Sequence, residues 1–382
     1  MLARRPLDET YTSMPAEEVL RRIAARKAEL GDELCILGHH YQRDEVFQFA
    51  DFTGDSLKLS QLAAGAKVRW IVFCGVHFMA ESADILTDPE QVVILPDLSA
   101  GCAMADMVEA EDIAEALERI RLAAGGAKVA PVTYVNSSAE VKAVTGRAGG
   151  ACCTSSNARN VFEWALADEA RGGAGAEKVL AAPDQHLARN TAVAMGYGVE
   201  DCAVYDPRTP GGGLADEQIR AAKFILWWGH CYVHQRFSVE QIERVRRARP
   251  GIKVIVHPEC TYEVVSAADM SGSTEQILRS VGDSPSGTAW AVGTETNMVR
   301  RLAASNPDKY VRVLSDTPPI CVTMARIDPP HLLWVLDSLA AGEVVNRITV
   351  PADVAAEARV AVERMIAIKP SGGAAQGDRA KG

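Results

Sequence analysis

Nine cysteines are the residues of this 382-residue chain most able to bind a metal. No two of them have the CxxC spacing of zinc ribbons and ferredoxins. Cys102, Cys231 and Cys321 each follow an apolar run and stand among polar or turn-forming residues. If the fold brings them together, their thiolates could hold a metal or an iron–sulfur cluster. Cys260, which directly follows Glu259, is an alternative ligand.

The remaining cysteines are predicted to be structural, because a free cysteine is often a small buried hydrophobic residue. Their odd total also favours thiols over disulfides, as expected in a reducing compartment. These residues are Cys35, Cys74, Cys152, Cys153 and Cys202.

Three cysteine ligands, rather than four, would leave one iron of a [4Fe–4S] cluster without a protein ligand. Such an iron can act as a Lewis acid toward a hydroxyl, carboxylate or carbonyl oxygen. A cluster of this kind is expected to assist loss of water rather than to transfer electrons.

Titratable residues stand where predicted strands end: His39, Tyr41, His234, His257 and Glu259. Histidine exchanges protons near neutral pH, so these residues are candidates for acid–base catalysis. A histidine at a strand end is also often only a hydrogen-bonded structural group, and that alternative stays open.

Hydroxyl-bearing residues precede several helical patterns, at Ser56, Thr154–Asn157 and Gly272–Thr274. They are either helix N-caps or binding sites in which hydroxyls and helix amides hold a carboxylate or phosphate. The chain has no GxxxxGK[ST] loop and no GxGxxG in a suitable turn, so a nucleotide is not expected.

The elements that must position these residues are short apolar runs alternating with helical patterns, the first helix lying at residues 15–30. This alternation indicates parallel sheets covered by helices on both faces, in which ligands bind beyond the carboxyl ends of the strands. The predicted strands are Leu34–Gly38, Trp70–Cys74, Val92–Leu95, Ala130–Val135, Lys178–Ala182, Phe224–Trp228, Lys253–Val256, Thr288–Val292 and Tyr310–Leu314.

The pattern of strand, polar cluster and helix occurs three times, with one of the three cysteines in each repeat. The sequence therefore predicts an α/β protein of three similar three-layer α/β/α domains in a pseudo-threefold arrangement. The expected domains are 30–108 with helices from about 330–369, 109–230 with an insertion near 197–220, and 231–329. Cys231, which ends the second repeat, stands at the boundary between the second and third domains. Residues 1–14 and 370–382 are expected to be flexible.

The composition narrows the range of functions. A formal net charge of −10 argues against a general nucleic-acid binder. No apolar stretch approaches the roughly 20 residues of a membrane span, and the N-terminus lacks the apolar region of a signal peptide. A cytoplasmic protein that acts on small molecules is expected.

Taken together, these residues resemble those of the A-type quinolinate synthase family over about residues 30–350. The resemblance implies a [4Fe–4S] cluster, one per chain, held by Cys102, Cys231 and Cys321. The matching motifs are Gly38-His39-His40-Tyr41-Gln42, Ala50–Ser56, Phe78–Ser82, Tyr134–Ser137, Thr154–Asn157, Gly229–His234, His257–Cys260 and Gly293–Glu295. His40 and His186 stand where asparagine is more usual in the family.

The resemblance also implies condensation of iminoaspartate with dihydroxyacetone phosphate to quinolinate, with loss of phosphate and water. L-aspartate oxidase is then the implied functional partner. Glu259 and Tyr41 would transfer protons, with His39 and His234 assisting. The implied substrate-binding residues are His39, Ser56, Tyr134, Asn136, Ser155, His257, Glu259, Ser273 and Thr274.

Two other interpretations remain at this point. An iron–sulfur hydro-lyase acting on a small hydroxy acid also needs an open iron. A non-catalytic protein could instead use the cysteines for structural zinc.

Overall fold

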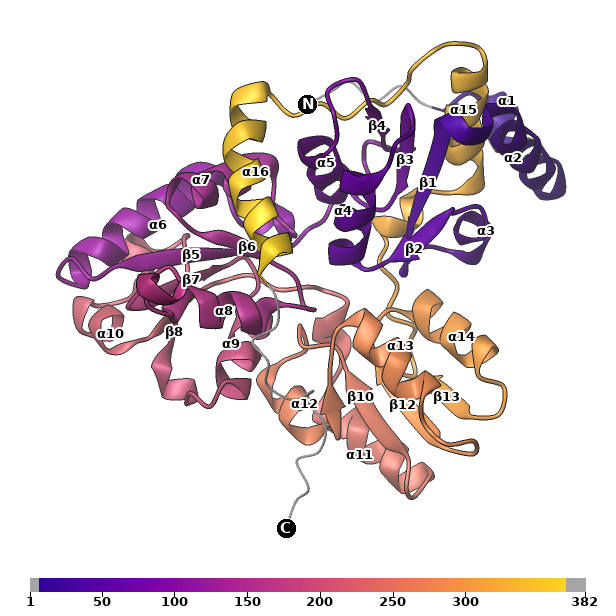
Figure 1. The fold of residues 1–382 in the computed structure, drawn as a ribbon. Helices are drawn as coiled ribbons and strands as arrows, with labels where there is room; N and C mark the ends of the chain where they lie inside the picture. Colours follow the sequence, from indigo (N-terminus) through magenta and orange to yellow (C-terminus); the bar gives the residue numbers. More distant parts are fainter. Residues whose placement is uncertain (1–6, 369–382) are drawn as a thin grey trace.

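Three parallel β-sheets, each flanked by helices, form three lobes around a common centre in the computed structural model, which describes residues 7–368 (Figure 1). The predicted fold class is confirmed.

The first sheet has the order β2 (Phe52–Gly54), β1 (Leu34–His39), β3 (Trp70–Cys74), β4 (Val92–Ile94). The second has the order β6 (Ala151–Cys153), β5 (Val129–Tyr134), β7 (Lys178–Ala182), β9 (Phe224–Trp227), β8 (Cys202–Tyr205). The third has the order β11 (Met270–Ser271), β10 (Lys253–Val256), β12 (Ala289–Gly293), β13 (Tyr310–Val313).

The strands form because their side chains are apolar on both faces, as a sheet covered by helices on both sides requires. Every residue of β1, β3, β5 and β7 is buried. The first and third sheets have the same strand order, and the second shares it once β8 is set aside. Three sheets of one topology explain why equivalent residues of each unit meet at the centre.

Strand β8 lies within the segment 197–220, which the sequence predicted to be a surface loop or insertion. It pairs in parallel with β9 and forms an edge strand of the second sheet. A Pro-Gly-rich turn follows at Pro210–Gly213, and helix α10 (Asp216–Ala221) completes the segment. The segment 197–220 is therefore part of the second unit and is not only a surface loop.

The other helices lie mainly between consecutive strands. Their bounds are α1 (Glu9–Thr12), α2 (Ala16–Leu30), α3 (Asp44–Phe47), α4 (Ser56–Gly65), α5 (His77–Leu86), α6 (Ala110–Ala123), α7 (Ala139–Arg147), α8 (Ala158–Leu166), α9 (Gln185–Ala194), α11 (Val239–Ala248), α12 (Tyr262–Ala267), α13 (Thr274–Gly282), α14 (Thr296–Ser305), α15 (Pro329–Ala340) and α16 (Ala352–Ala367).

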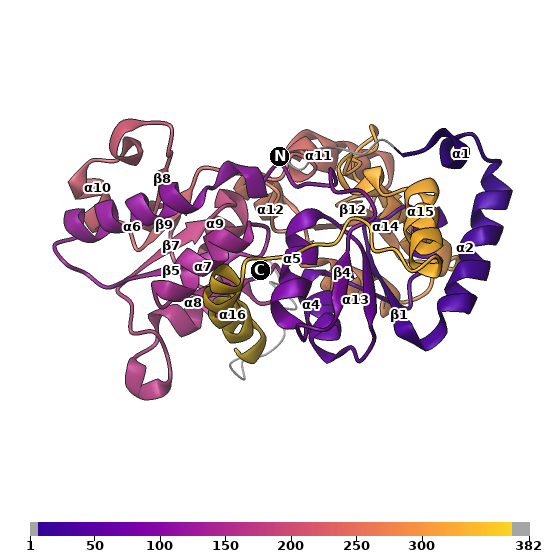
Figure 2. The same cartoon turned by 90° about the horizontal axis from the view of Figure 1, so that it is seen from above.

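The two C-terminal helices return to different units. Helix α15 packs against α2 in the first unit (Figures 1 and 2), whereas α16 packs mainly against α7 in the second and also contacts α5. Of the termini predicted to be flexible, residues 1–6 and 369–382 lie outside the described residues, and α1 lies within 7–14. No helix within residues 7–368 is long and apolar enough to cross a membrane.

Helices α7 and α16 pack closely enough to exclude a side chain at Gly146. A Cβ atom added there would lie 2.1 Å from the main-chain oxygen of Glu357. We expect Gly146→Ala to lower the free energy of unfolding by about 1–3 kcal/mol, the usual cost of overpacking. Gly65→Ala, at the end of α4 in open space, should change it by less than about 1 kcal/mol. Urea unfolding of the two variants measures the difference, and equal stabilities would contradict this packing.

Candidate active site

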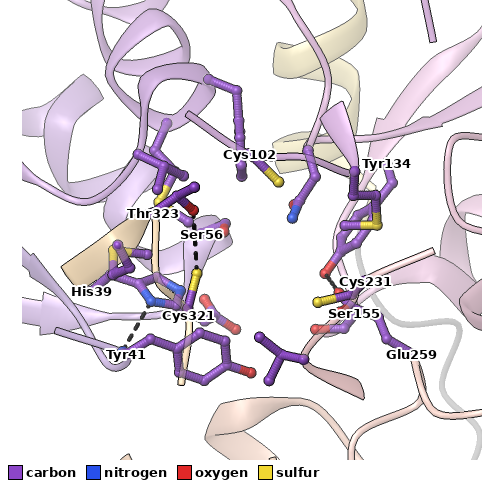
Figure 3. Close-up of a pocket in the computed structure, with 18 of the residues that line it drawn as sticks. His39, Tyr41, Ser56, Cys102, Tyr134, Ser155, Cys231, Glu259, Cys321 and Thr323 are labelled. Atoms are coloured by element: carbon purple, nitrogen blue, oxygen red, sulfur yellow. Dashed lines mark hydrogen bonds between the residues drawn. The ribbon is translucent and has the colours of Figure 1, made fainter. Parts of the chain in front are cut away.

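A cavity that is partly open to solvent lies where the carboxyl ends of the three sets of strands meet (Figure 3). Residues of all three units line it, as expected for ligand sites of parallel sheets. The apolar lining residues include Val76, Phe78, Met79, Met104, Val233 and Met324.

Cys102, Cys231 and Cys321 all line this cavity, and Figure 3 shows their sulfur atoms around one central space. Burial raises the pKa of Cys102 to about 12, and the Cys321 thiol adds to the effect. Burial, Glu259 and the other two thiols raise the pKa of Cys231 well above its ordinary value. Thiols that resist ionisation in this way become thiolates when a metal binds, so the donor set fits a metal centre.

One main-chain arrangement positions each thiol. In each unit, a helix follows the third strand. The first backbone amide of this helix donates a hydrogen bond to the backbone carbonyl two residues before the cysteine. The three bonds are His77 to Ala100 (2.8 Å), Gln185 to Gly229 (3.0 Å) and Thr296 to Pro319 (3.0 Å). A short 3₁₀ turn begins three residues after each cysteine, at Ala105–Met107, His234–Arg236 and Met324–Arg326.

The alternative ligand Cys260 does not line the cavity. It is fully buried in the hydrophobic core of the third unit, with its sulfur 3.9 Å from the main-chain oxygen of Gly293. The four cysteines in strands β1, β3 and β6 are buried as predicted, and Cys202 is half-buried in β8.

The acid–base residues form one buried cluster around Glu259. The Tyr134 hydroxyl donates to its Oε1 atom at 2.5 Å, and Nδ1 of His234 lies 2.6 Å from Oε2. The latter contact lacks hydrogen-bond alignment, so it is mainly electrostatic. Burial alone would raise the pKa of Glu259, but His257, His234 and Tyr134 outweigh it and hold this pKa below its ordinary value. Glu259 is therefore a buried carboxylate with close partners.

Two imidazoles of the site, those of His39 and His257, have lowered pKa values. Burial lowers the pKa of His39 to about 3, and it likewise lowers that of His257 to about 3. The rings of His257 and His234 stack with their centroids 4.5 Å apart. Burial raises the pKa of Tyr41 well above its ordinary value, so this phenol keeps its proton.

A second set of potential metal ligands overlaps the first. One ligand atom from each of Cys231, His234 and Glu259 lies within 4.8 Å of the others, so these residues could hold a single metal ion. The two sets share Cys231 and differ in the other ligands.

The quinolinate synthetase A protein family (NadA) matches residues 21–367. The chain belongs to this family. It is 54% identical over 366 residues to the quinolinate synthase of Nocardioides sp., which covers 95% of this chain and 92% of the relative. The quinolinate synthase of Acidobacterium capsulatum is 53% identical over 362 residues, covering 94% and 95% of the two chains. That of Streptomyces coelicolor is 53% identical over 355 residues, covering 92% and 88%. The chain is thus an enzyme of the quinolinate synthetase A family.

Most residues assigned from the family resemblance face the cavity. His39, Tyr41, Ser56, Tyr134, Asn136, Ser155, His257, Glu259 and Thr274 all line it. His234 does not line the cavity, but its Nδ1 lies 2.6 Å from Oε2 of Glu259, which does. Ser273 is buried at the start of α13, where its hydroxyl accepts a bond from the amide of Gln276 (3.4 Å) and acts as the N-cap.

Two cavity-lining groups have no partner within the described chain: Oδ1 of Asn136 and Oγ1 of Thr274. Buried polar atoms without partners are costly, so these two are suited to bind a polar ligand. The hydroxyl of Ser155 instead contacts Nε2 of His257 at 3.2 Å.

The two departures from the family pattern have different surroundings. Nε2 of His40 lies 3.0 Å from Oε1 of Glu275 and thereby links the first and third units. His186 lies on α9 and does not line the cavity, and burial lowers its pKa to about 4.

Thr294 lies in the Gly293–Glu295 motif, but the sequence alone gave this residue no role. The Thr294 hydroxyl lies 2.8 Å from the Tyr41 hydroxyl and 3.1 Å from Nε2 of His234. Its two partners were both named as catalytic candidates. The signal that could have found Thr294 is its position directly after a buried strand.

Proposed function

We propose that this chain condenses iminoaspartate with dihydroxyacetone phosphate to form quinolinate, one phosphate and two waters. The observation that carries the proposal is a single cavity in which one thiol from each unit faces hydroxyl, amide and carboxylate groups. Family membership supports the same product, since the relatives bear the name quinolinate synthase.

Cys102, Cys231 and Cys321 are proposed to hold one [4Fe–4S] cluster. Their equivalent positions in three units and their place around one cavity support this set over one that includes Cys260, which lies in the hydrophobic core. When bound, such a cluster offers an iron without a protein ligand, which supplies Lewis-acid activation of a substrate oxygen.

The polar groups of the cavity fit anionic substrates. Ser56 is the first residue of α4, and Thr274 is the first residue of α13. Amides at a helix start carry a partial positive charge that favours phosphate and carboxylate groups. We propose that Ser56, Ser155 and Thr274, with Asn136 and Tyr134, bind the phosphate and the carboxylates. Ser273 acts on this site only through the cap of α13.

Proton transfers are assigned to Glu259 and Tyr41. Glu259 is ionised and can accept a proton, whereas Tyr41 keeps its proton and can donate it. His234 contacts Glu259, and the amide of Tyr41 donates to Nδ1 of His39 at 3.1 Å, so both histidines can assist. The apolar lining residues limit water at this site. Electrostatic contacts are stronger where water is excluded.

We also propose that L-aspartate oxidase is a functional partner, because its oxidation of aspartate supplies iminoaspartate. A cytoplasmic location is proposed with it, since the three thiols require a reducing compartment to stay free for metal.

An anaerobic assay of the purified holoenzyme tests the reaction. With iminoaspartate generated enzymatically and dihydroxyacetone phosphate added, we expect quinolinate and phosphate in equal amounts. Omission of the triose phosphate should abolish both products. Water exchange on a hydroxy acid without triose phosphate would instead support a hydro-lyase. A colourless zinc protein with neither activity would support the non-catalytic interpretation.

Serine substitutions test the ligand set. We expect Cys102→Ser, Cys231→Ser and Cys321→Ser each to lower iron content and visible absorbance by at least about tenfold. Cys260→Ser, the matched control, should keep both. If only Cys231→Ser, His234→Ala and Glu259→Gln lose metal, then the metal is held by the second set of ligands.

Glu259→Gln tests the base. It removes the negative charge between His234 and His257 while keeping the shape of the side chain. We expect kcat for quinolinate formation to fall by about 10²–10⁴-fold, the usual contribution of a general base. Iron content, measured on the same sample, should be unchanged. Full turnover with an intact cluster would remove Glu259 from the mechanism.

A further inference from the structure

Lys142 is a buried lysine of the second unit that the proposed mechanism does not use. It lies on α7, which contacts α5 of the first unit (Figure 1). A buried ammonium group is costly unless it is paired and hydrogen-bonded. The Nζ atom of Lys142 donates to the main-chain oxygen of Ser137 and lies 5.6 Å from the centre of the Phe78 ring. Phe78 belongs to α5, so this ammonium group lies at the boundary between two units.

Glu81 reaches the same boundary from the first unit. It lies on α5, and its Oε2 atom accepts a hydrogen bond from the amide of Ala139 at 3.1 Å. Ala139 is the first residue of α7, and the free amides at a helix start attract a negative group. The Glu81 side chain is 12% exposed, and its Oε1 atom lies 3.5 Å from Nδ1 of His77. A carboxylate of the first unit thus caps a helix of the second.

The two side chains have opposite charges and share a buried environment. Burial lowers the pKa of Lys142, and the carboxylate of Glu81 opposes this shift. Burial raises the pKa of Glu81, and the ammonium group of Lys142 opposes that shift. Each charge therefore stabilises the other. Removal of one partner from a buried pair is costly, because the remaining charge loses its compensation.

Glu81 and Lys142 converge on one loop. The loop 135–138, termed the Asn136 loop, joins β5 to α7. The lysine holds the main-chain oxygen of Ser137 in this loop, and the carboxylate holds the first amide of α7 directly after it. Asn136 lines the cavity, and its Oδ1 atom has no partner within residues 7–368. The two charges therefore fix the main chain next to an amide that is suited to bind a ligand.

We propose that Glu81 and Lys142 are positioning residues, which together hold the Asn136 loop of the second unit against α5 of the first. Neither residue lines the cavity, so they act on a ligand only through Asn136. The amide of His77, at the start of α5, binds the loop before Cys102. The pair thus relates a ligand-binding amide to a thiol of another unit. The effect on ligand binding rests on the proposed function, whereas the coupling of the two charges does not.

Other contacts keep the first two units together. Ile85 of α5, Ala143 of α7 and Ala358 of α16 belong to one buried apolar cluster. Oδ2 of Asp84 on α5 accepts a hydrogen bond from the amide of Val350 at 2.8 Å. Loss of the charged pair should therefore leave these units docked and disturb mainly the loop that the pair holds.

Urea unfolding of the holoenzyme tests the pair. Glu81→Gln keeps an oxygen for the helix amide but leaves the ammonium group of Lys142 without a counter-charge. We expect it to raise the unfolding equilibrium constant about 100-fold or more. Adding Lys142→Met, which keeps the length of the side chain, should lower that constant again by at least about tenfold. If Glu81→Gln is recovered unfolded, folding of the double variant supports the pair.

Two outcomes of the unfolding experiment would overturn the proposal. One is a Glu81→Gln variant as stable as the wild type. The other is a double variant no more stable than Glu81→Gln, including failure of both to fold.

Glu140→Gln is the matched control for the charge. Glu140 also lies on α7 but is exposed, so solvent screens its charge. Its substitution should change the unfolding constant by less than about threefold. The effect should multiply with that of Lys142→Met. Coupling as strong as that of Glu81 would show that any nearby carboxylate acts in this way, and the proposal would be wrong.

Calorimetry with quinolinate on the anaerobic holoenzyme tests the effect on the cavity. We expect Lys142→Met to raise the dissociation constant about tenfold, as for loss of one hydrogen bond to a charged group. Asn136→Ala should raise it at least as much. Adding Lys142→Met to Asn136→Ala should then change little, because the lysine acts through that residue. Effects that multiply would overturn the positioning role. Unchanged affinity in Asn136→Ala would count against the proposed function, and the unfolding experiment would still decide the pair.

Lys178→Met is the matched control for a buried lysine. Lys178 lies on β7, does not line the cavity, and donates to the main-chain oxygens of Arg220 (2.7 Å) and Ala222 (2.6 Å). This variant should lose stability and still bind quinolinate as the wild type does. An equal loss of affinity in Lys178→Met would show a general effect of buried lysines and would contradict the proposal.

An anaerobic crystal structure of Lys142→Met shows the position of the loop directly. We expect the carbonyl of Ser137 and the side chain of Asn136 to move relative to α5, whereas Lys178→Met leaves both in place. An unchanged Asn136 loop in Lys142→Met would overturn the positioning role, whatever the activity of the enzyme.

Discussion

In every unit, the first amide of one helix donates to a carbonyl two residues before a cysteine. This main-chain bond depends on no particular side chain, so it survives in three units whose sequences differ at that helix start. It ties the loop that carries the thiol to the end of a buried strand, and a rigid sheet therefore sets the position of each sulfur. The three sulfurs meet because the three sheets share one topology.

The second constraint is the burial of Glu259. An isolated carboxylate in such a place would lose its charge, because desolvation favours the neutral acid. Two imidazoles and a tyrosine hydroxyl compensate for the lost water. A proton-transfer site needs the same groups. The partners that stabilise the charge of Glu259 are therefore also the partners with which it could exchange protons. The same burial lowers the pKa of His257.

The long strands could be predicted from sequence because they are apolar on both faces, and β1, β3, β5 and β7 agree closely with the predicted runs. The strands β2, β6 and β11 have only two or three residues and were not predicted, because so short a segment gives no periodicity. Strand β4 is equally short, but it lies in the apolar run Val92–Leu95 and was predicted from that run. Strand β8 was not predicted, because the prolines and glycines of its segment are typical of a loop.

The family resemblance identified most residues that line the cavity, since each lies in a motif at a strand end. It did not distinguish Ser273, whose hydroxyl is used in a helix cap, from Thr274, which faces the cavity. Thr294 was missed because its partners come from other segments, and local sequence carries no information on such contacts.

Each unit contributes one of the sulfur atoms of Cys102, Cys231 and Cys321. The distances between these sulfur atoms therefore depend on how the three units are oriented. A metal centre that spanned these sulfurs would join the three units, and its binding energy would add to the energy that holds them together. Movement of one unit away from the others would then withdraw a metal ligand. In this arrangement, one small centre would connect all three units, because each unit supplies one of its ligands.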